Sequence, residues 1–301
     1  YRYDTLVNFM PLNQIRGVNK LFTTVNDKLP DDGLWVCCYE PQSVTKRNIL
    51  HRYPPVLNWL YYIAFFLYKR VLPKMIMTSR LYFDITEGKD RVLSKAEVLG
   101  RLCYCGFEIV TERKIGDLNY VIARRQFRPQ LTNRRLYGIF VKLKRVGKGG
   151  KKFNVFKLRT MHPYSEFLQA YIYDRYSLQE GGKFNHDIRV TTLGRIARKY
   201  WLDELPMLLN LIKGDMKLVG VRPISQHYFS LYSPELQAKR ICHKPGWLPP
   251  FYADMPKTLE EIEASEMRYL TMCEEKGTFK TDIIYFWRIF YTIVFKRARS
   301  H

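Results

Sequence analysis

Two adjacent carboxylates, Asp203 and Glu204, are the residues of this sequence best placed to do chemistry. Cations surround them on both sides: Arg189, Arg195, Arg198 and Lys199 before, and Lys213, Lys217 and Arg222 after. Acids enclosed by bases are typical of a site that holds phosphate together with a divalent metal ion. Taken alone, the pair is also compatible with an acid-capped helix in an ion-pair network.

Two helices are expected to position this pair. Apolar residues recur at helical spacing over 191–201, and the opposite face carries Arg195, Arg198 and Lys199. Asp203 is expected to cap a second helix that ends at Gly214. The expected buried face of that helix consists of Leu205, Leu208, Leu209 and Ile212. The free amides and the dipole at its start favour ionised carboxylates and also a bound phosphate.

A basic hairpin is predicted over residues 144–161. Glycines at 147, 149 and 150 indicate a tight turn between two strands. The alternation over 153–159 places Lys157 and Arg159 on the same side as Val155, where they could clamp an anion. An ordinary basic hairpin is the alternative, and the stretch lacks the Walker pattern.

Composition narrows the class of partner. The 301 residues are 47% hydrophobic, as in a packed globular protein, and carry a formal net charge of +22. Such an excess calls for an anionic partner: a nucleic acid, an anionic membrane surface or a phosphorylated substrate. The six cysteines show no metal-ligand spacing and are expected to be reduced thiols.

Two aromatic, apolar segments are candidate membrane helices. Residues 53–77 are flanked by basic residues and broken at Pro73, and their apolar core would span only roughly 20 Å, less than the roughly 30 Å of a bilayer core. This favours a re-entrant or interfacial membrane helix, with a buried core helix as the alternative. Residues 282–298 predict a second interfacial helix, with a core or dimer helix as the alternative.

Residues 1–127 predict a partial α/β (Rossmann-like) segment. A helix capped by Ser94 and ended by Gly106 precedes an expected strand pair at 107–110 and 120–123. This order resembles the C-terminal end of a class I methyltransferase fold. The glycine-rich cofactor loop is absent, so the resemblance implies a scaffold, and an unrelated α/β element is equally compatible. Residues 128–143 are expected to form a basic linker.

The sequence D-I-R-V-T-T-L-G-R-I-A-R-K-Y-W-L-D-E-L-P-M-L-L-N-L-I-K-G-D-M-K-L-V-G-V-R-P, from Asp187 to Pro223, closely resembles the signature of the bacterial sugar transferases. These are polyprenyl-phosphate hexose-1-phosphate transferases. The upstream block R-V-G-K-G-G-K-K-F-N-V-F-K-L-R-T-M and the downstream Lys-Pro-Gly at 244–246 look like the family's flanking blocks, in order. The resemblance covers residues 144–301.

This resemblance implies transfer of a sugar-1-phosphate from a nucleotide sugar, with UDP expected as the nucleotide, to polyprenyl (undecaprenyl) phosphate. Asp203 matches the family's nucleophile, which forms a covalent phosphosugar intermediate. Glu204 would help to hold Mg²⁺. The matching phosphate binders are Lys157 and Arg222, with Arg159 and Arg198 as neighbours. Further candidates for the site are Arg145, Arg189, Asp254 and Glu266.

The sequence also departs from the family pattern. Val221 replaces the usual proline before Arg222, Met207 stands where glutamine is common, and Trp247 begins an unusual run after Lys-Pro-Gly. The hydrophobic helix comes earlier than the family's membrane helix and breaks at Pro73. These departures put the choice of sugar and the route of the lipid in question.

The sequence therefore predicts an α+β protein in which a partial α/β segment precedes a small, helix-rich catalytic domain with a short β-hairpin. We expect it on the cytoplasmic face of the bacterial inner membrane, and a homodimer is possible. The alternative is a basic nucleic-acid-binding protein without catalysis.

Overall fold

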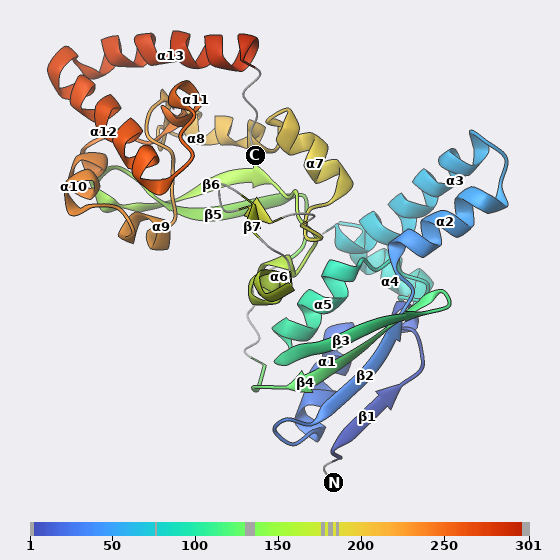
Figure 1. The fold of residues 1–301 in the computed structure, drawn as a ribbon. Coiled ribbons are helices and arrows are strands. Elements are labelled where there is room, and N and C mark those ends of the chain that lie inside the picture. The colour runs from blue at the N-terminus through green and yellow to red at the C-terminus, as the bar shows by residue number, and fades with distance from the viewer. Residues whose placement is uncertain are drawn as a thin grey trace. The chain divides into compact units, whose positions relative to one another are not determined.

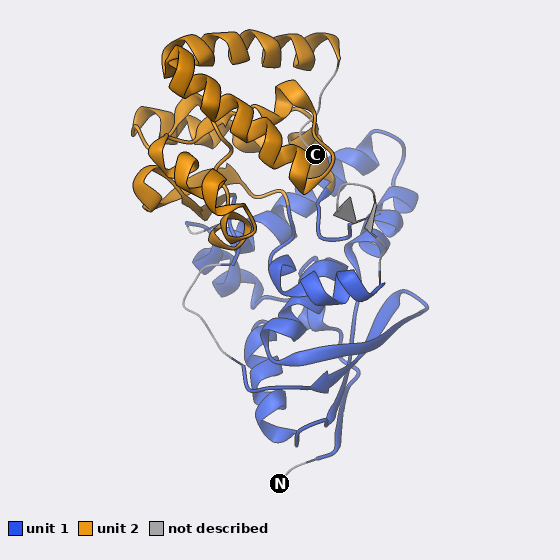
Figure 2. Cartoon of the chain, turned by 60° about the vertical axis from the view of Figure 1, so that its left-hand side comes forward, with its two compact units in different colours: residues 1–139, 161–177, 184–191 blue, residues 140–160, 178–183, 192–301 orange. Residues whose placement is uncertain are grey.

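A computed structural model describes residues 3–75, 77–129, 136–175, 178–179, 183–184 and 187–296. The chain forms two compact units, shown in different colours in Figure 2. Unit 1 consists of residues 1–139, 161–177 and 184–191, and unit 2 of residues 140–160, 178–183 and 192–301. Helices and strands occur in both units, which confirms the α+β class.

Unit 1 is built on a mixed four-stranded sheet. Its strands are β1 (Thr5–Asn8), β2 (Leu34–Tyr39), β3 (Phe107–Ile115) and β4 (Leu118–Arg125). The order is β1-β2-β4-β3, with β1 parallel to β2 and β4 antiparallel to both of its neighbours (Figure 1). The expected hairpin is therefore confirmed, and its returning strand lies inside the sheet.

Two helices supply the other half of this core. They are α1 (Val18–Lys28) and α5 (Lys95–Tyr104). Phe22 of α1 packs edge-on against Phe107 of β3. The Ser94 side chain caps α5 by accepting a hydrogen bond from the Glu97 amide, as the sequence predicts. Gly106 has φ +86, and a Cβ there would lie 2.1 Å from the Phe127 carbonyl oxygen, so only glycine fits.

The remaining helical elements of unit 1 surround this core. They are η1 (Leu12–Gln14), α2 (Gln42–Arg52), α3 (Leu57–Phe66), the π-helix η2 (Leu67–Val71), η3 (Leu72–Lys74), α4 (Ser79–Thr86), η5 (Ser165–Leu168) and α6 (Gln169–Arg175). The helix begun by α3 changes to π and then to 3-10 geometry, and Pro73 lies buried in η3. None of the helices in the described residues is long and apolar enough to cross a membrane.

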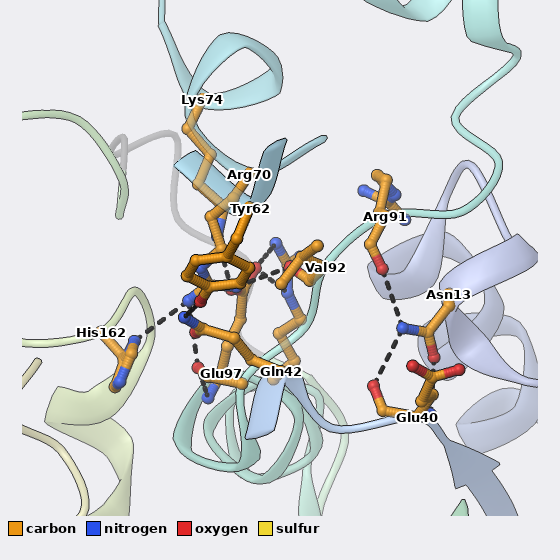
Figure 3. A network of polar contacts seen from close by, with 12 residues as sticks. Asn13, Glu40, Gln42, Tyr62, Arg70, Lys74, Arg91, Val92, Glu97 and His162 are labelled. Atoms are coloured by element: carbon orange, nitrogen blue, oxygen red, sulfur yellow. Dashed lines mark hydrogen bonds and ion pairs between the residues drawn. The ribbon is translucent and has the colours of Figure 1, made fainter. Parts of the chain in front are cut away.

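A buried polar network holds the end of this helix (Figure 3). The Arg70 guanidinium donates to Glu97 Oε2 at 2.7 Å and to the Val92 carbonyl oxygen at 2.7 Å. Lys74 and Arg101 also bind the Glu97 carboxylate. Although burial opposes it, these three cations hold the pKa of Glu97 well below its usual range. A single buried carboxylate thus anchors η2 and η3 to α5.

His162 completes the network as a neutral imidazole. Its Nδ1 lies 3.0 Å from Arg70 Nη2. Because a guanidinium can only donate, Nδ1 must accept, and the ring proton is then on Nε2. Burial and the positive charge of Arg70 lower the pKa of His162 to about 3. Burial and Arg70 likewise lower the pKa of Lys74 to about 7.

Unit 2 is rich in helices and contains the predicted hairpin. Its strands are β5 (Phe140–Val146), β6 (Lys152–Leu158), β9 (Lys217–Val219) and β10 (Gly246–Leu248). Between β5 and β6 lies the short η4 (Lys148–Gly150), where Gly149 and Gly150 have φ +67 and +71, as a tight glycine turn requires. The strands β9 and β10 pair in parallel. The short pair β7 (Leu178–Gln179) and β8 (Lys183–Phe184) is separate.

Further helical elements complete the described part of unit 2. They are α7 (Thr192–Lys199), η6 (Leu202–Met207), α8 (Leu208–Ile212), α9 (Gln226–Ser230), α10 (Pro234–Cys242), α11 (Phe251–Asp254), α12 (Leu259–Lys276) and α13 (Thr278–Phe295). Gly277 joins α12 to α13, and Tyr269 and Tyr285 pack edge-on between these two helices. One face of α13 is buried at Tyr285 and Ile289, and the other exposes Trp287.

The units divide the chain differently from the expected domains at 1–127 and 144–301. Residues 140–143, expected in the linker, belong to β5, whose pairing with β6 recruits them. Residues 161–177 pack in unit 1 because Leu168 and Ile172 fill its core. Residues 130–135 of the expected linker lie outside the described residues.

We predict that His162 makes unit 1 sensitive to acid. Its pKa is lower in the folded state than in the unfolded chain, where it is about 6.5. The unfolded state therefore binds more protons between pH 6.5 and 3, and stability falls as the pH falls through that window, by at most about 1.4 kcal/mol per pH unit. Urea unfolding of His162→Gln should show a weaker acid dependence than the unchanged protein. An identical slope would exclude His162 as the cause.

Candidate functional site

The acidic pair lies at the start of η6. Trp201 adopts a left-handed conformation, φ 54, and separates η6 from α7. Its indole donates a hydrogen bond of 3.1 Å to Tyr252 Oη, which fixes the bend. Asp203 and Glu204 are only 7% and 6% exposed. The element is a 3-10 helix rather than the expected α-helix. Its N-cap residue is Trp201, without a side-chain cap hydrogen bond, so Asp203 lies in the first turn and is not the cap that the sequence predicts.

Lys157 neutralises one member of the pair. Its Nζ donates to Glu204 Oε1 at 2.6 Å, and the lysine side chain is 21% exposed. Val155, two residues earlier on β6, is buried against Met207 of η6. The predicted alternation of β6 is thus confirmed for Val155 and Lys157, which both line the same cavity.

Asp203 is the less compensated member. Its Oδ1 is buried and has no hydrogen-bond partner among the described residues. Burial raises the pKa of Asp203, and Glu204 raises it further, while Lys157 and Arg198 act to lower it. A buried acceptor without a partner is costly, so it favours a cation or a donor in a bound ligand.

A small cavity opens beside the pair. Its volume is about 60 Å³, and its wall includes Arg145, Lys157, Glu204, Arg222 and Trp247. Burial and the nearby Arg222 lower the pKa of Arg145. Within the residues that the structure describes, no carboxylate pairs with either arginine. Two adjacent guanidiniums without an acid between them favour a bound anion.

The helix that follows the acids turns its apolar side outward, which corrects the expected buried face. Leu205, Leu208, Leu209 and Ile212 are 42–82% exposed. Asn210, in contrast, is fully buried and donates to the Asn154 carbonyl oxygen at 2.8 Å. Its Oδ1 also accepts from the Phe156 amide at 3.1 Å. These bonds hold the Asn210 side of α8 against the edge of β6.

Other expected site residues have different surroundings. Arg198 donates to Thr160 Oγ1 at 3.0 Å and adds positive charge near Asp203. Arg159 follows β6 but is not among the residues that line the cavity. Arg189 belongs to unit 1, where it binds the Asp187 carboxylate at 2.7 Å and Gln169, whereas the acidic pair belongs to unit 2.

The two additional acids serve the packing of the helices. Asp254 accepts hydrogen bonds from Ser265 at 2.7 Å and from Arg268 and Arg288, and so joins α11 to α12 and α13. Glu266 forms a buried ion pair with Arg240. Neither lines the cavity beside Asp203. Tyr252 also lines that cavity, and it could not be singled out from the sequence because an aromatic ring has no sequence signature of a site.

The acidic pair fits Mg²⁺ better than a metal that needs many protein ligands. No group of three or more histidine, cysteine, aspartate or glutamate side chains in the described part of the chain could hold a metal ion. Mg²⁺ usually takes one or two carboxylates and completes its coordination with water and substrate phosphates. The unpartnered Oδ1 of Asp203 is a suitable ligand atom.

The buried acids and the cations around them lie in a part of the chain that matches a known family. Residues 130–296, more than half of the chain, match the bacterial sugar transferase family. The chain therefore belongs to that family. This confirms the resemblance inferred from the residues around Asp203.

Curated relatives carry matching names. The chain is 40% identical over 108 residues to the uncharacterized sugar transferase EpsL of Bacillus subtilis, covering 36% of this chain and 47% of EpsL. It is 43% identical over 105 residues to the UDP-glucose:undecaprenyl-phosphate glucose-1-phosphate transferase of Caulobacter vibrioides, covering 34% and 35%. Identity to the UDP-N-acetylgalactosamine-undecaprenyl-phosphate N-acetylgalactosaminephosphotransferase of Aeromonas hydrophila is 37% over 106 residues, covering 34% and 22%. The matches thus span less than half of each relative.

We predict that Lys157→Met destabilises unit 2. The change leaves the Glu204 carboxylate buried without its cation, and breaking such a pair costs about 3 kcal/mol. Urea unfolding should show this loss, and Lys157→Met combined with Glu204→Gln should recover most of it. Lys152→Met, at an exposed position of the same strand, is the matched control. Equal stability of the Lys157 and Lys152 variants would contradict a stabilising role for the pair.

Proposed function

We propose that this protein is a membrane-associated phosphoglycosyl transferase. It would move a sugar-1-phosphate from a nucleotide sugar, with UDP as the expected nucleotide, to undecaprenyl phosphate, and so begin the synthesis of an exopolysaccharide, capsule or O-antigen. The observation that carries this proposal is the buried Oδ1 of Asp203, which has no hydrogen-bond partner among the described residues. The neighbouring Glu204 lines a cavity together with Lys157, Arg145 and Arg222. Membership of the sugar transferase family and the names of the relatives support it.

In the first half-reaction, a carboxylate oxygen of Asp203 attacks the phosphorus that bears the sugar. The bond between that phosphorus and the bridging oxygen breaks, and the nucleoside monophosphate leaves with the electron pair. The product is an acyl phosphate between Asp203 and the sugar. In the second half-reaction, a phosphate oxygen of undecaprenyl phosphate attacks the same phosphorus and releases the Asp203 carboxylate.

The cations have distinct tasks in this scheme. Arg145 and Arg222 would bind the phosphate oxygens, including those of the leaving group, because neither pairs with a carboxylate in the part of the chain described. Lys157 holds Glu204 and lowers the pKa of Asp203, which keeps more of the nucleophile ionised. Asp203 and Glu204 would hold Mg²⁺, whose chemistry there would be to neutralise charge on phosphate oxygens.

The lipid substrate suggests the role of the exposed apolar surface around the site. Large apolar side chains on α7, η6 and α8, and Tyr200 between α7 and η6, lie open to solvent: Leu193, Ile196, Tyr200, Leu202, Leu205, Leu208, Leu209 and Ile212. So many exposed apolar side chains within one short stretch are typical of an interaction site, and Arg195 and Lys199 on α7 add charges that attract anionic lipid. We propose attachment to the cytoplasmic face of the bacterial inner membrane. Helix α3 and α13 would contribute their exposed aromatic residues.

Asp203→Asn should abolish turnover, because an amide is a poor nucleophile and cannot form the acyl phosphate. The assay incubates the membrane-reconstituted protein with Mg²⁺, undecaprenyl phosphate and a panel of UDP-sugars and measures release of nucleoside monophosphate. Mass spectrometry of the unchanged protein without lipid acceptor should show a sugar-phosphate adduct on Asp203. An active Asp203→Asn enzyme would sink the covalent mechanism.

The apolar surface has its own test. Leu209→Ser combined with Ile212→Ser removes two exposed apolar side chains and leaves the buried Asn210 unchanged. The double variant should weaken flotation with anionic phospholipid vesicles by about tenfold. An apolar side chain contributes about 1.5–3 kcal/mol when it is fully buried, and less when it is partly inserted into the membrane. Tyr173→Ser, at an exposed position of unit 1, is the control. Unchanged flotation of the double variant would show that this face does not meet the membrane.

A further inference from the structure

A second, larger cavity of unit 2 adjoins the one beside the acids. Its volume is about 260 Å³. The two cavities share Arg145, Arg222 and Pro223 in their walls. Arg145 and Arg222 therefore line both cavities. The smaller cavity also contains Glu204 in its wall, and the larger one does not.

The second cavity is lined with aromatic rings. Tyr228 of α9 and Tyr232 pack edge-on, with ring centroids 5.5 Å apart. Phe251 of α11 lines it as well and carries the Arg222 guanidinium above its face, 5.9 Å from the ring centroid. Rings beside a guanidinium pair are the chemistry with which proteins hold a nucleobase next to its phosphates, by stacking and by charge.

We propose that this aromatic cavity binds the nucleoside of the donor, and that the base stacks on Tyr228 and Phe251. This inference rests on the proposed function. The donor then lies across both cavities, with its diphosphate at Arg145 and Arg222 and its sugar-bearing phosphorus toward Lys157 and the acids. The leaving nucleoside monophosphate remains on the side of the rings, away from the position that the lipid phosphate must take.

The charges of the cavity agree with an anionic ligand. Glu266 is the carboxylate among its lining residues, and it is buried and ion-paired with Arg240. Arg240 also donates to the Arg222 carbonyl oxygen at 2.6 Å. The Arg240–Glu266 pair thus fixes the backbone that presents Arg222 and leaves no uncompensated negative charge to repel a phosphate.

The test separates the base from the phosphates. Titration calorimetry on the detergent-purified full chain measures the Kd of UDP, of inorganic pyrophosphate and of hexose 1-phosphate. Tyr228→Leu and Phe251→Leu should each raise the Kd of UDP about tenfold, as loss of one stacking partner does. Tyr228→Leu should leave the Kd of pyrophosphate and hexose 1-phosphate unchanged. Tyr228→Phe, which keeps the ring, should bind UDP like the unchanged protein, and Tyr173→Leu is the control outside unit 2.

Each other outcome overturns the inference in a recognisable way. If the leucine variants bind UDP normally, the base lies elsewhere, while turnover by the unchanged protein would still support the transferase. If they weaken hexose 1-phosphate instead, the cavity holds the sugar. If the unchanged protein neither binds UDP nor releases nucleoside monophosphate from any nucleotide sugar, the proposed function fails and the inference falls with it.

Discussion

The hydrogen bonds of Asn210 are the constraint on which the site depends. The buried amide joins α8 to the exposed edge of β6 through the Asn154 carbonyl oxygen and the Phe156 amide. Because an unpaired buried amide is costly, these bonds hold the Asn210 side of the helix inward. The same rotation buries Met207 and the acidic pair and leaves the leucines of η6 and α8 at the surface.

This arrangement gathers charge from separate parts of the chain. Lys157 comes from β6, Arg145 from β5, and Arg222 from the turn after β9. Strand β9 pairs with β10 so closely that glycine is required at Gly246. A Cβ on Gly246 would lie 2.1 Å from the Gly220 amide nitrogen, so the two strands approach too closely for any side chain there. The hairpin and the parallel pair thus act as a rigid frame that holds cations around a short, irregular helix.

Much of this could be predicted from the sequence. The acidic pair, the glycine turn and the alternation that presents Lys157 follow from local rules, and so do α5 and the hairpin of unit 1. The orientation of α8 could not be predicted, since a stripe of leucines has the same period whether it faces a core or a membrane surface. The partners of Arg189, Asp254 and Glu266 were also hidden, because a charge in a sequence does not reveal the partner brought to it by folding.

The difference between the two acids follows from this geometry and not from their residue types. They are neighbours on a tight 3-10 turn, and both are buried, yet the lysine of β6 binds only Glu204. Glu204 therefore has its charge balanced by a lysine, while Asp203 keeps a raised pKa and an acceptor oxygen without a partner among the described residues. A carboxylate that its own protein leaves incompletely satisfied gains most from an arriving cation or phosphorus centre. That asymmetry supports the assignment of the nucleophile to Asp203 independently of the family pattern.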